Sequence, residues 1–313
     1  MNSNIFSKKL FVSFLILTFN FCNLQAFENK ILFKIDNEII TTIDIYHELK
    51  FLKTFNPQIN ELNNDEQLVV SKNSIIRDKI KKTEILNFVE EVKVEDKFIM
   101  NLLKGKYSQI EFSSMVNFEN YLKENDLNDK LIKEKFAIEL IWNDLVFQKY
   151  NSKISIDKKK IKSEILNKPK KNLRELSISE IIFNVSKKSE FEKKYEQILK
   201  DIELTGFKNA ALIHSVSDTA SIGGYIGWIK EDNLNEKIRK RISDLEKGEF
   251  SEPILTSSGF LIIKVEDEKK YEVDFNLDNE INNLIQFKTN EQLNQFSRLY
   301  FNKIKKNVIF NEL

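Results

Sequence analysis

The stretch from Ser215 to Asp267 reads SVSDTASIGGYIGWIKEDNLNEKIRKRISDLEKGEFSEPILTSSGFLIIKVED. The chain of 313 residues has only seven glycines and three prolines. This one stretch holds Gly223, Gly224, Gly227, Gly248, Pro253 and Gly259. Glycine has no Cβ and tolerates positive φ, so glycines gathered in a glycine-poor chain predict several sharp turns here.

Regular structure is predicted between these turns. The Gly223-Gly224 pair leads into an apolar alternation that predicts a short strand. Asn233 is the predicted N-cap of a helix that ends at Gly248. The helix would present one apolar face, made of Leu234, Ile238, Ile242 and Leu245. Two strands, 250–256 and 260–265, would then form a hairpin around Ser257-Ser258-Gly259.

Upstream residues add a strand at 178–185 and helices at 190–204 and 207–214. The predicted order over residues 178–267 is therefore β-α-α-β-α-β-β, an α+β domain. This stretch resembles the parvulin-type peptidyl-prolyl isomerases. The resemblance is carried, in order, by Ser215, Ala220, Gly223, Gly224, Gly227 and Trp228, by Lys247 to Pro253, and by Thr256, Gly259 and Phe260.

The resemblance implies a substrate pocket for a prolyl ring. Rotation about a peptide bond faces a barrier of ~18–20 kcal/mol. Catalysis needs an apolar seat for the ring and polar groups that favour the twisted amide. The matching positions are Ile226, Leu234 and Ile238, with Thr256 at the edge. Ordinary core packing of strand and helix is the alternative reading of the same apolar residues.

The polar positions implied by the resemblance carry unusual residues. Glu180 and Leu261 stand where the family has two histidines, and Ser217 stands where it has a cysteine or aspartate. Asp218 and Ser258 are the neighbouring candidates for the polar role. Glu180 could be either a buried polar replacement or a solvent-facing strand residue. The sequence has no metal-ligand spacing, Walker loop or Gly-x-Gly-x-x-Gly, so no cofactor and no nucleotide are predicted.

The rest of the chain is predicted to be mostly helical. Residues 31–41 predict a hairpin around Asp36-Asn37, and Thr41 with Asp44 predicts a capping box for a helix through Phe55. Further helices are expected at 74–92, 96–105, 117–125 and 129–150, and a short one after Asp157. An apolar stripe marks the 129–150 helix: Leu131, Ile138, Ile141, Trp142 and Leu145. Trp142 is interpreted as core.

The residues from Asn37 to Asp44, and the 140–157 region, resemble the SurA-type chaperones. A last helix follows Asp267, with Ile281, Leu284, Ile285, Leu293, Phe296, Tyr300 and Ile304 on one face. The resemblance implies that this helix folds back on the N-terminal helices, with residues 308–310 near the opening hairpin. The predicted domains are a signal peptide (1–26), a helical chaperone domain (27–172), a parvulin domain (173–268) and the returning C-terminal helix (269–313).

Residues 1–26 predict export. Lys8-Lys9 precede an apolar run from Leu10 to Phe21, and the segment ends at Ala26, the pattern of a cleaved signal peptide. An uncleaved anchor is the alternative, although the run is shorter than the roughly 20 residues that a spanning helix needs. Cys22 is the only cysteine and would be removed with the leader. The predicted location is the periplasm.

Composition narrows the function classes. Net charge is +1 with 31% charged residues, which argues against a nucleic-acid partner. The prediction is a periplasmic foldase with peptidyl-prolyl isomerase activity, whose partners are unfolded or proline-containing exported polypeptides such as outer-membrane proteins. The alternative is an ATP-independent holdase with an inert parvulin domain. A helical envelope scaffold, a third reading, does not explain the ordered glycines.

Overall fold

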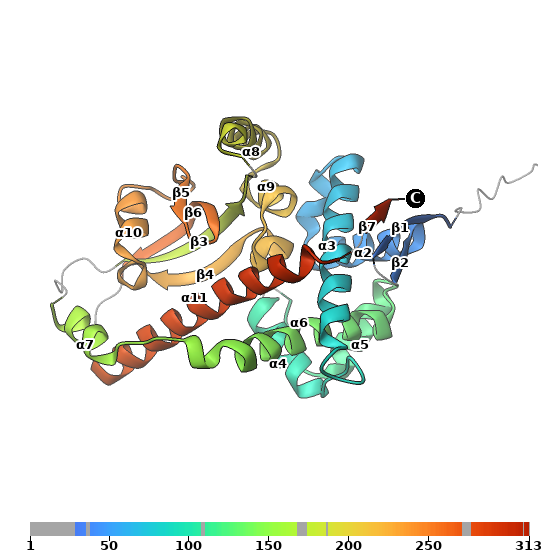
Figure 1. Cartoon of the computed structure of the whole chain (residues 1–313), viewed down its shortest axis with the longest axis horizontal. Helices are drawn as coiled ribbons and strands as arrows, with labels where there is room; N and C mark the ends of the chain where they lie inside the picture. Colours follow the sequence, from blue (N-terminus) through green and yellow to red (C-terminus); the bar gives the residue numbers. More distant parts are fainter. Residues whose placement is uncertain are drawn as a thin grey trace, which may run out of the picture. The chain divides into compact units, whose positions relative to one another are not determined.

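The computed structural model describes residues 29–35, 38–107, 110–167, 174–185, 187–270, 277–308 and 310–312 (Figure 1). The predicted signal peptide and the Asp36-Asn37 turn lie outside these residues. Among the helices described, none has the length and apolar character needed to cross a bilayer.

The N-terminal part is a hairpin followed by helices. Strands β1 (Ile31–Ile35) and β2 (Glu38–Thr41) pair antiparallel, as predicted. The helices are α2 (Thr42–Phe55), α3 (Asn64–Ile85), α4 (Asp96–Lys106), α5 (Met115–Glu124), α6 (Asp129–Tyr150) and α7 (Lys158–Asn167). The Thr41–Asp44 capping box is present, with Thr41 N donating to Asp44 Oδ2 at 2.8 Å.

Details of two of these helices differ from the sequence prediction. Helix α3 begins at Asn64, ten residues before the predicted start, because Asn63 and Glu66 form a second capping box. It ends at Ile85, seven residues before the predicted end. On α6, Leu131 is exposed, and the buried stripe runs instead through Ile132, Phe136, Ile138, Trp142 and Val146. Trp142 is fully buried, which confirms its interpretation as core.

The C-terminal helix α11 (Leu277–Lys305) lies against α6, α3 and α7. The ring of Tyr300 stacks on that of Trp142 at 5.3 Å, and Trp142 Nε1 donates to Ser297 Oγ at 2.9 Å. Strand β7 (Phe310–Glu312) then pairs antiparallel with β1, so that the order of this small sheet is β2-β1-β7. The last strand of the chain therefore completes the sheet begun by the first.

Between α7 and α11 lies a four-stranded antiparallel sheet with the order β4-β3-β6-β5. Its elements are β3 (Arg174–Phe183), α8 (Phe191–Thr205), α9 (Phe207–His214), β4 (Tyr225–Lys230), α10 (Glu236–Ile242), β5 (Ile254–Thr256) and β6 (Gly259–Lys270). Leaving aside short 3-10 turns, this is the predicted β-α-α-β-α-β-β order. The α+β class is confirmed.

The helix after β4 is shorter than predicted. Its N-cap is Asn235, not Asn233: Asn235 Oδ1 accepts the N–H of Ile238 at 2.9 Å, while Asn233 ends a 3-10 turn. Gly248 does not end the helix, which stops at Ile242. The N–H of Gly248 donates to the carbonyl of Val265 at 2.8 Å. Gly248, with φ of 96°, therefore turns the chain back toward β6. The predicted strand 250–256 is likewise reduced to β5 and one bridge at Phe250.

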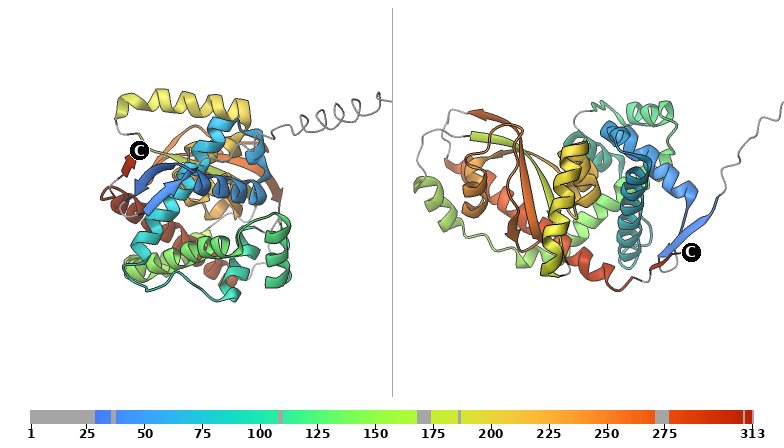
Figure 2. Two further views of the ribbon diagram at one scale, coloured as in Figure 1. Left: turned by 90° about the vertical axis from the view of Figure 1, so that its right-hand side faces the viewer. Right: turned by 90° about the horizontal axis from the view of Figure 1, so that it is seen from above.

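Each face of this sheet is covered differently (Figure 2). Alternate strand residues point to opposite faces. Ile181, Phe183 and Ile262 pack under α8 and α9. On the other face, Leu176, Ile178, Ile182, Leu261, Ile263 and Val265 pack with α10 and with Phe287 of α11. The second face carries the candidate site.

Candidate active site

A groove of about 580 Å³ lies on the α10 face of the sheet. Seven of the nine residues predicted to form the site line it: Glu180, Ile226, Leu234, Ile238, Thr256, Ser258 and Leu261. Leu234 and Ile238 are almost fully buried, whereas Ile226 on the edge strand β4 is 40% exposed. The three apolar residues predicted to seat a prolyl ring thus share one concave surface.

The alternation of side chains along β3 places Glu180 in this groove. Glu180 has the same parity on β3 as Ile178 and Ile182, so its side chain points to the groove face. Leu261 on β6 pairs with Ile182 and points to the same face. The two positions at which the parvulin resemblance implies histidines are therefore neighbours in the fold.

Glu180 is a buried carboxylate, which decides between the two readings left open by the sequence. It is 9% exposed, and its Oε1 accepts hydrogen bonds from Ser217 Oγ at 2.5 Å and Thr219 Oγ1 at 3.0 Å. Its backbone N–H also donates to Gly224 O at 2.8 Å. A Cβ on Gly224 would lie 2.2 Å from the carbonyl oxygen of Glu180, so only glycine allows this approach.

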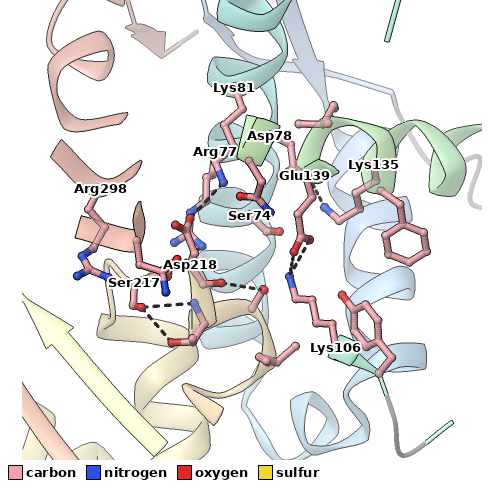
Figure 3. A pocket seen from close by; sticks show the side chains of 18 of the residues that line it. Ser74, Arg77, Asp78, Lys81, Lys106, Lys135, Glu139, Ser217, Asp218 and Arg298 are labelled. Atoms are coloured by element: carbon pink, nitrogen blue, oxygen red, sulfur yellow. Dashed lines mark hydrogen bonds and ion pairs between the residues drawn. The ribbon is translucent and has the colours of Figure 1, made fainter. Parts of the chain in front are cut away.

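Ser217 and Asp218 do not line the groove. They line a second, polar cavity of about 260 Å³ beside it, formed with residues of α3, α4, α6 and α11 (Figure 3). Four residues line both spaces: Glu180, Thr219, Asn294 and Arg298. The predicted polar set is therefore divided between two adjoining cavities, with Glu180 at the boundary.

Asp218 is held by the helices on the far side of the second cavity. Its Oδ1 accepts from Lys81 Nζ of α3 at 3.1 Å, and its Oδ2 accepts from Ser297 Oγ of α11 at 3.1 Å. Burial alone would raise the pKa of Asp218. The charges of Lys81 and Arg77 and the two hydrogen bonds outweigh burial and hold the pKa well below its usual range. Asp218 is thus an ionised side chain that contacts α3 and α11, and it does not line the groove.

Two lysines of this second cavity are also paired with carboxylates. Lys106 Nζ lies 2.7 Å from Glu139 Oε2 (Figure 3), and Lys135 contacts both Glu48 and Asp78. Burial lowers the pKa of Lys135, but these carboxylates outweigh burial and raise it. The sequence prediction contained none of these residues, because they come from four helices, α2, α3, α4 and α6.

Helix α11 lines one side of the groove. No α11 residue was predicted from the sequence to be part of the site. The lining residues of α11 are Phe287, Asn290, Glu291, Asn294, Gln295 and Arg298. Their spacing of three, one, three, one and three places them on one helical face. The sequence does place these residues on a different face of the helix from the predicted apolar face, but no local pattern indicates what that second face contacts.

Neither histidine of the chain is in the groove. His214 Nε2 lies 2.6 Å from Asp201 Oδ2, its Nδ1 lies 3.0 Å from Lys194 Nζ, and burial lowers its pKa. His47 lies in the helical part, beside Tyr46. Of the described residues that line the groove, none is histidine or cysteine. The described residues also contain no cluster of three His, Cys, Asp or Glu that could hold a metal ion.

Comparison with known proteins finds similarity over the segment that contains the groove residues. Residues 165–267 match the family described as rotamase, the PPIC-type PPIase domain. This segment resembles a PPIC-type rotamase domain. That match includes β3 to β5, most of β6, and all seven groove residues named above.

The wider chain is similar to chaperones and foldases. It is 25% identical over 177 residues to the chaperone SurA of Nitrosococcus oceani, which covers 54% of this chain and 42% of the relative. It is 26% identical over 208 residues to the foldase protein PrsA of Bacillus subtilis, covering 66% of this chain and 60% of PrsA. The chain therefore spans less than two thirds of either relative.

The solved structures that the chain matches include one described as a SurA-like chaperone of Campylobacter jejuni, with 18% identity, a TM-score of 0.35, and coverage of 91% of this chain and 99% of that one. Another is the peptidylprolyl isomerase PrsA of Bacillus anthracis, with 20% identity, a TM-score of 0.30, and coverage of 76% and 98%.

Proposed function

We propose that this protein is a foldase that binds unfolded polypeptides and isomerises their prolyl bonds in the groove on the sheet. The observation that carries the proposal is the shared concavity of Ile226, Leu234, Ile238 and Leu261, with the buried carboxylate of Glu180 beside them. These residues lie inside the segment that matches the PPIC-type PPIase domain.

The groove offers a physical route to isomerisation without covalent chemistry. A planar X–Pro amide is strongly polarised by resonance, and twisting it removes that polarisation. An apolar seat that excludes water therefore favours the twisted amide relative to the planar one. Ser258 Oγ, which accepts a hydrogen bond from Arg298 at 3.0 Å, can still donate its own proton to an amide group in the groove.

The test is a proline-peptide isomerisation assay with a substitution on the apolar wall. Ile226→Thr keeps a β-branched residue on an edge strand but puts a hydroxyl against the prolyl ring. We expect kcat/KM to fall about tenfold, which corresponds to the loss of about 1.4 kcal/mol of contact. Ile39→Thr is the matched control, because Ile39 is a similarly exposed isoleucine on the edge strand β2. Equal activity of the wild-type protein and buffer would overturn the isomerase proposal.

A second candidate is a holdase whose groove binds prolyl segments without turnover. The observation that favours it is the side chain at Leu261, which lies in the groove where the family resemblance implies a histidine. Suppression of aggregation of an unfolded protein at stoichiometric amounts, with no acceleration of isomerisation, would support it. In that case Ile226→Thr should weaken client binding instead of turnover.

We further propose that the chain is exported, with residues 1–26 as a cleaved leader, and that it acts on outer-membrane proteins in the periplasm. The basic and apolar pattern of residues 8–26 supports the first part. We also propose that residues 27–172 and 269–313 form one chaperone domain into which residues 173–268 are inserted. The pairing of β7 with β1 and the packing of α11 on α6 support this division. The N-terminal sequence of the protein purified from its native host would test the predicted cleavage near Ala26.

A further inference from the structure

The groove has two walls of different chemistry. The sheet and α10 supply isoleucines and leucines, whereas the facing side of α11 supplies Asn290, Glu291, Asn294, Gln295 and Arg298 beside a single apolar residue, Phe287. A helix that served only to cover an apolar groove would present apolar residues to it. The polar composition of this face needs another explanation.

Contacts at two places hold α11 against the sheet. Toward its N-terminal end, Glu280 accepts from Lys230 Nζ at 2.5 Å, and Phe287 packs against the apolar cluster of the sheet. Further along, Gln295 Nε2 donates to Ser257 Oγ at 2.8 Å, and Arg298 donates to Ser258 Oγ at 3.0 Å. The helix is thus tied to β4 and to the β5–β6 turn, while an open space remains between helix and sheet.

Donors and acceptors remain available on this wall. Asn290 and Asn294 are exposed and line the groove, and each amide can both donate and accept. Among the described residues, no acceptor lies within hydrogen-bonding distance of Arg298 Nε, although this nitrogen is buried. A buried donor without a partner is costly and is typically satisfied by a ligand or by water.

The charge of the groove points to an uncharged ligand. Its acidic residues, Glu180 and Glu291, are balanced by Lys237 and Arg298. Burial raises the pKa of Glu291 despite the charges of Lys288 and Arg298. Neutral amide side chains facing an apolar shelf match the peptide backbone, which carries one donor and one acceptor per residue apart from proline.

We propose that α11 forms the polar wall of a composite groove and that Asn290, Asn294 and Arg298 bind the backbone of an extended, uncharged segment around the proline. The first and last of the lining residues on α11, Phe287 and Arg298, are eleven steps apart, or about 16 Å of helix at 1.5 Å per residue. An extended chain rises about 3.3 Å per residue, so about five residues run along this wall. This inference rests on the proposed function, since it assumes that the apolar shelf holds a prolyl ring.

The test compares a proline tetrapeptide with a neutral decapeptide that has the same four residues at its centre. Binding is measured by fluorescence anisotropy of labelled peptides, and turnover by the isomerisation assay. The variant is Asn290→Ala/Asn294→Ala, in which alanine favours the helix at both exposed sites. The matched control is Asn282→Ala/Asn283→Ala, because these asparagines are exposed on the same helix and do not line the groove.

We expect the wild-type protein to bind the decapeptide more tightly than the tetrapeptide. The Asn290/Asn294 variant should lose at least about fivefold of decapeptide affinity, as expected for two hydrogen bonds of about 0.5 kcal/mol or more each. The Asn282→Ala/Asn283→Ala control should bind both peptides as the wild-type protein does, because neither asparagine lines the groove. Equal wild-type affinity for both peptides would overturn the inference and leave the proposed function standing.

Two further outcomes are informative. If the Asn290/Asn294 variant binds or turns over both peptides better than the wild type, α11 covers the groove instead of lining it for the substrate, and the inference is wrong. If the wild-type protein neither binds nor isomerises the tetrapeptide, the proposed function itself fails, and the inference fails with it.

Discussion

At the residue scale, Asp218 shows how a predicted site residue acquires another role. The carboxylate was a candidate for polar catalysis because it lies one residue from a family position. In the fold it accepts hydrogen bonds from Lys81 and Ser297, and Ser297 in turn accepts one from Trp142. This chain of contacts joins the loop before β4 to three helices.

Replacing Asp218 with asparagine is expected to lower the free energy of unfolding by about 1–2 kcal/mol at neutral pH. The value is below the 3–5 kcal/mol typical of a fully buried ion pair, because the Asp218 side chain keeps 41% of its exposure and water screens the charge. Urea denaturation measures the change. Asp267→Asn, which breaks an exposed pair with Lys247, serves as the control and should change stability far less.

The same pair predicts a pH dependence with a definite sign. The pKa of Asp218 is lower in the folded protein than in the unfolded chain, so its contribution is present above the ordinary aspartate pKa of about 3.9. It is lost as pH falls through the folded pKa. The difference in stability between wild type and Asp218→Asn should therefore be constant from pH 7 to 5 and shrink below about pH 4. A difference that grows on acidification would contradict this account.

At the element scale, α10 is short and depends on its cap. The helix has seven residues, and Ile238 in its first turn forms part of the groove. Short helices gain little from propensity and are stabilised by capping and packing. Asn235, whose side chain accepts the N–H of Ile238, is the residue on which this part of the groove depends.

Asn235→Ala should lower the free energy of unfolding by about 1 kcal/mol, as is typical for loss of an N-cap side chain. Asn235→Ser should retain most of the stability, because serine also caps. Asn233→Ala is the matched control and should be close to neutral, since Asn233 ends the preceding 3-10 turn without capping a helix. Thermal or urea denaturation of the three variants would measure this. A larger effect at Asn233 than at Asn235 would show that the cap is misassigned.

At the scale of the whole chain, α11 connects the helices to the sheet. Tyr300 stacks on Trp142 of α6, while Phe287 packs on the sheet cluster, and both residues belong to one continuous helix. Because a single helix contributes to both cores, we expect them to unfold together.

The two tryptophans allow this to be measured. Trp228→Phe leaves Trp142 as the only tryptophan, and Trp142→Phe leaves Trp228 on β4. Within each variant, the urea transitions followed by fluorescence and by far-UV circular dichroism should coincide, as in a two-state system. Separate midpoints for the two probes in either variant would show that helices and sheet unfold independently.

Local patterns in the sequence were sufficient for much of the fold. The Thr41–Asp44 cap, the two hairpins and the β-α-α-β-α-β-β order of elements all follow from residues close together in the chain. The apolar wall at Ile226, Leu234 and Ile238 was implied by the parvulin resemblance. Hydrogen bonding and side-chain periodicity act over a few residues, so the sequence displays them directly. The helix ends were less certain, because several asparagines could cap and only packing selects one.

Tertiary structure alone decided how the polar groups are used. Lys81 and Asp218 are 137 residues apart, and Arg298 and Ser258 are 40 apart. No local pattern shows that Asp218 belongs to a contact with α3 and α11, that Glu180 is buried against Ser217 and Thr219, or that α11 forms a wall of the groove. Such contacts depend on which surfaces meet after folding, and burial then determines the charge state and partners of each side chain.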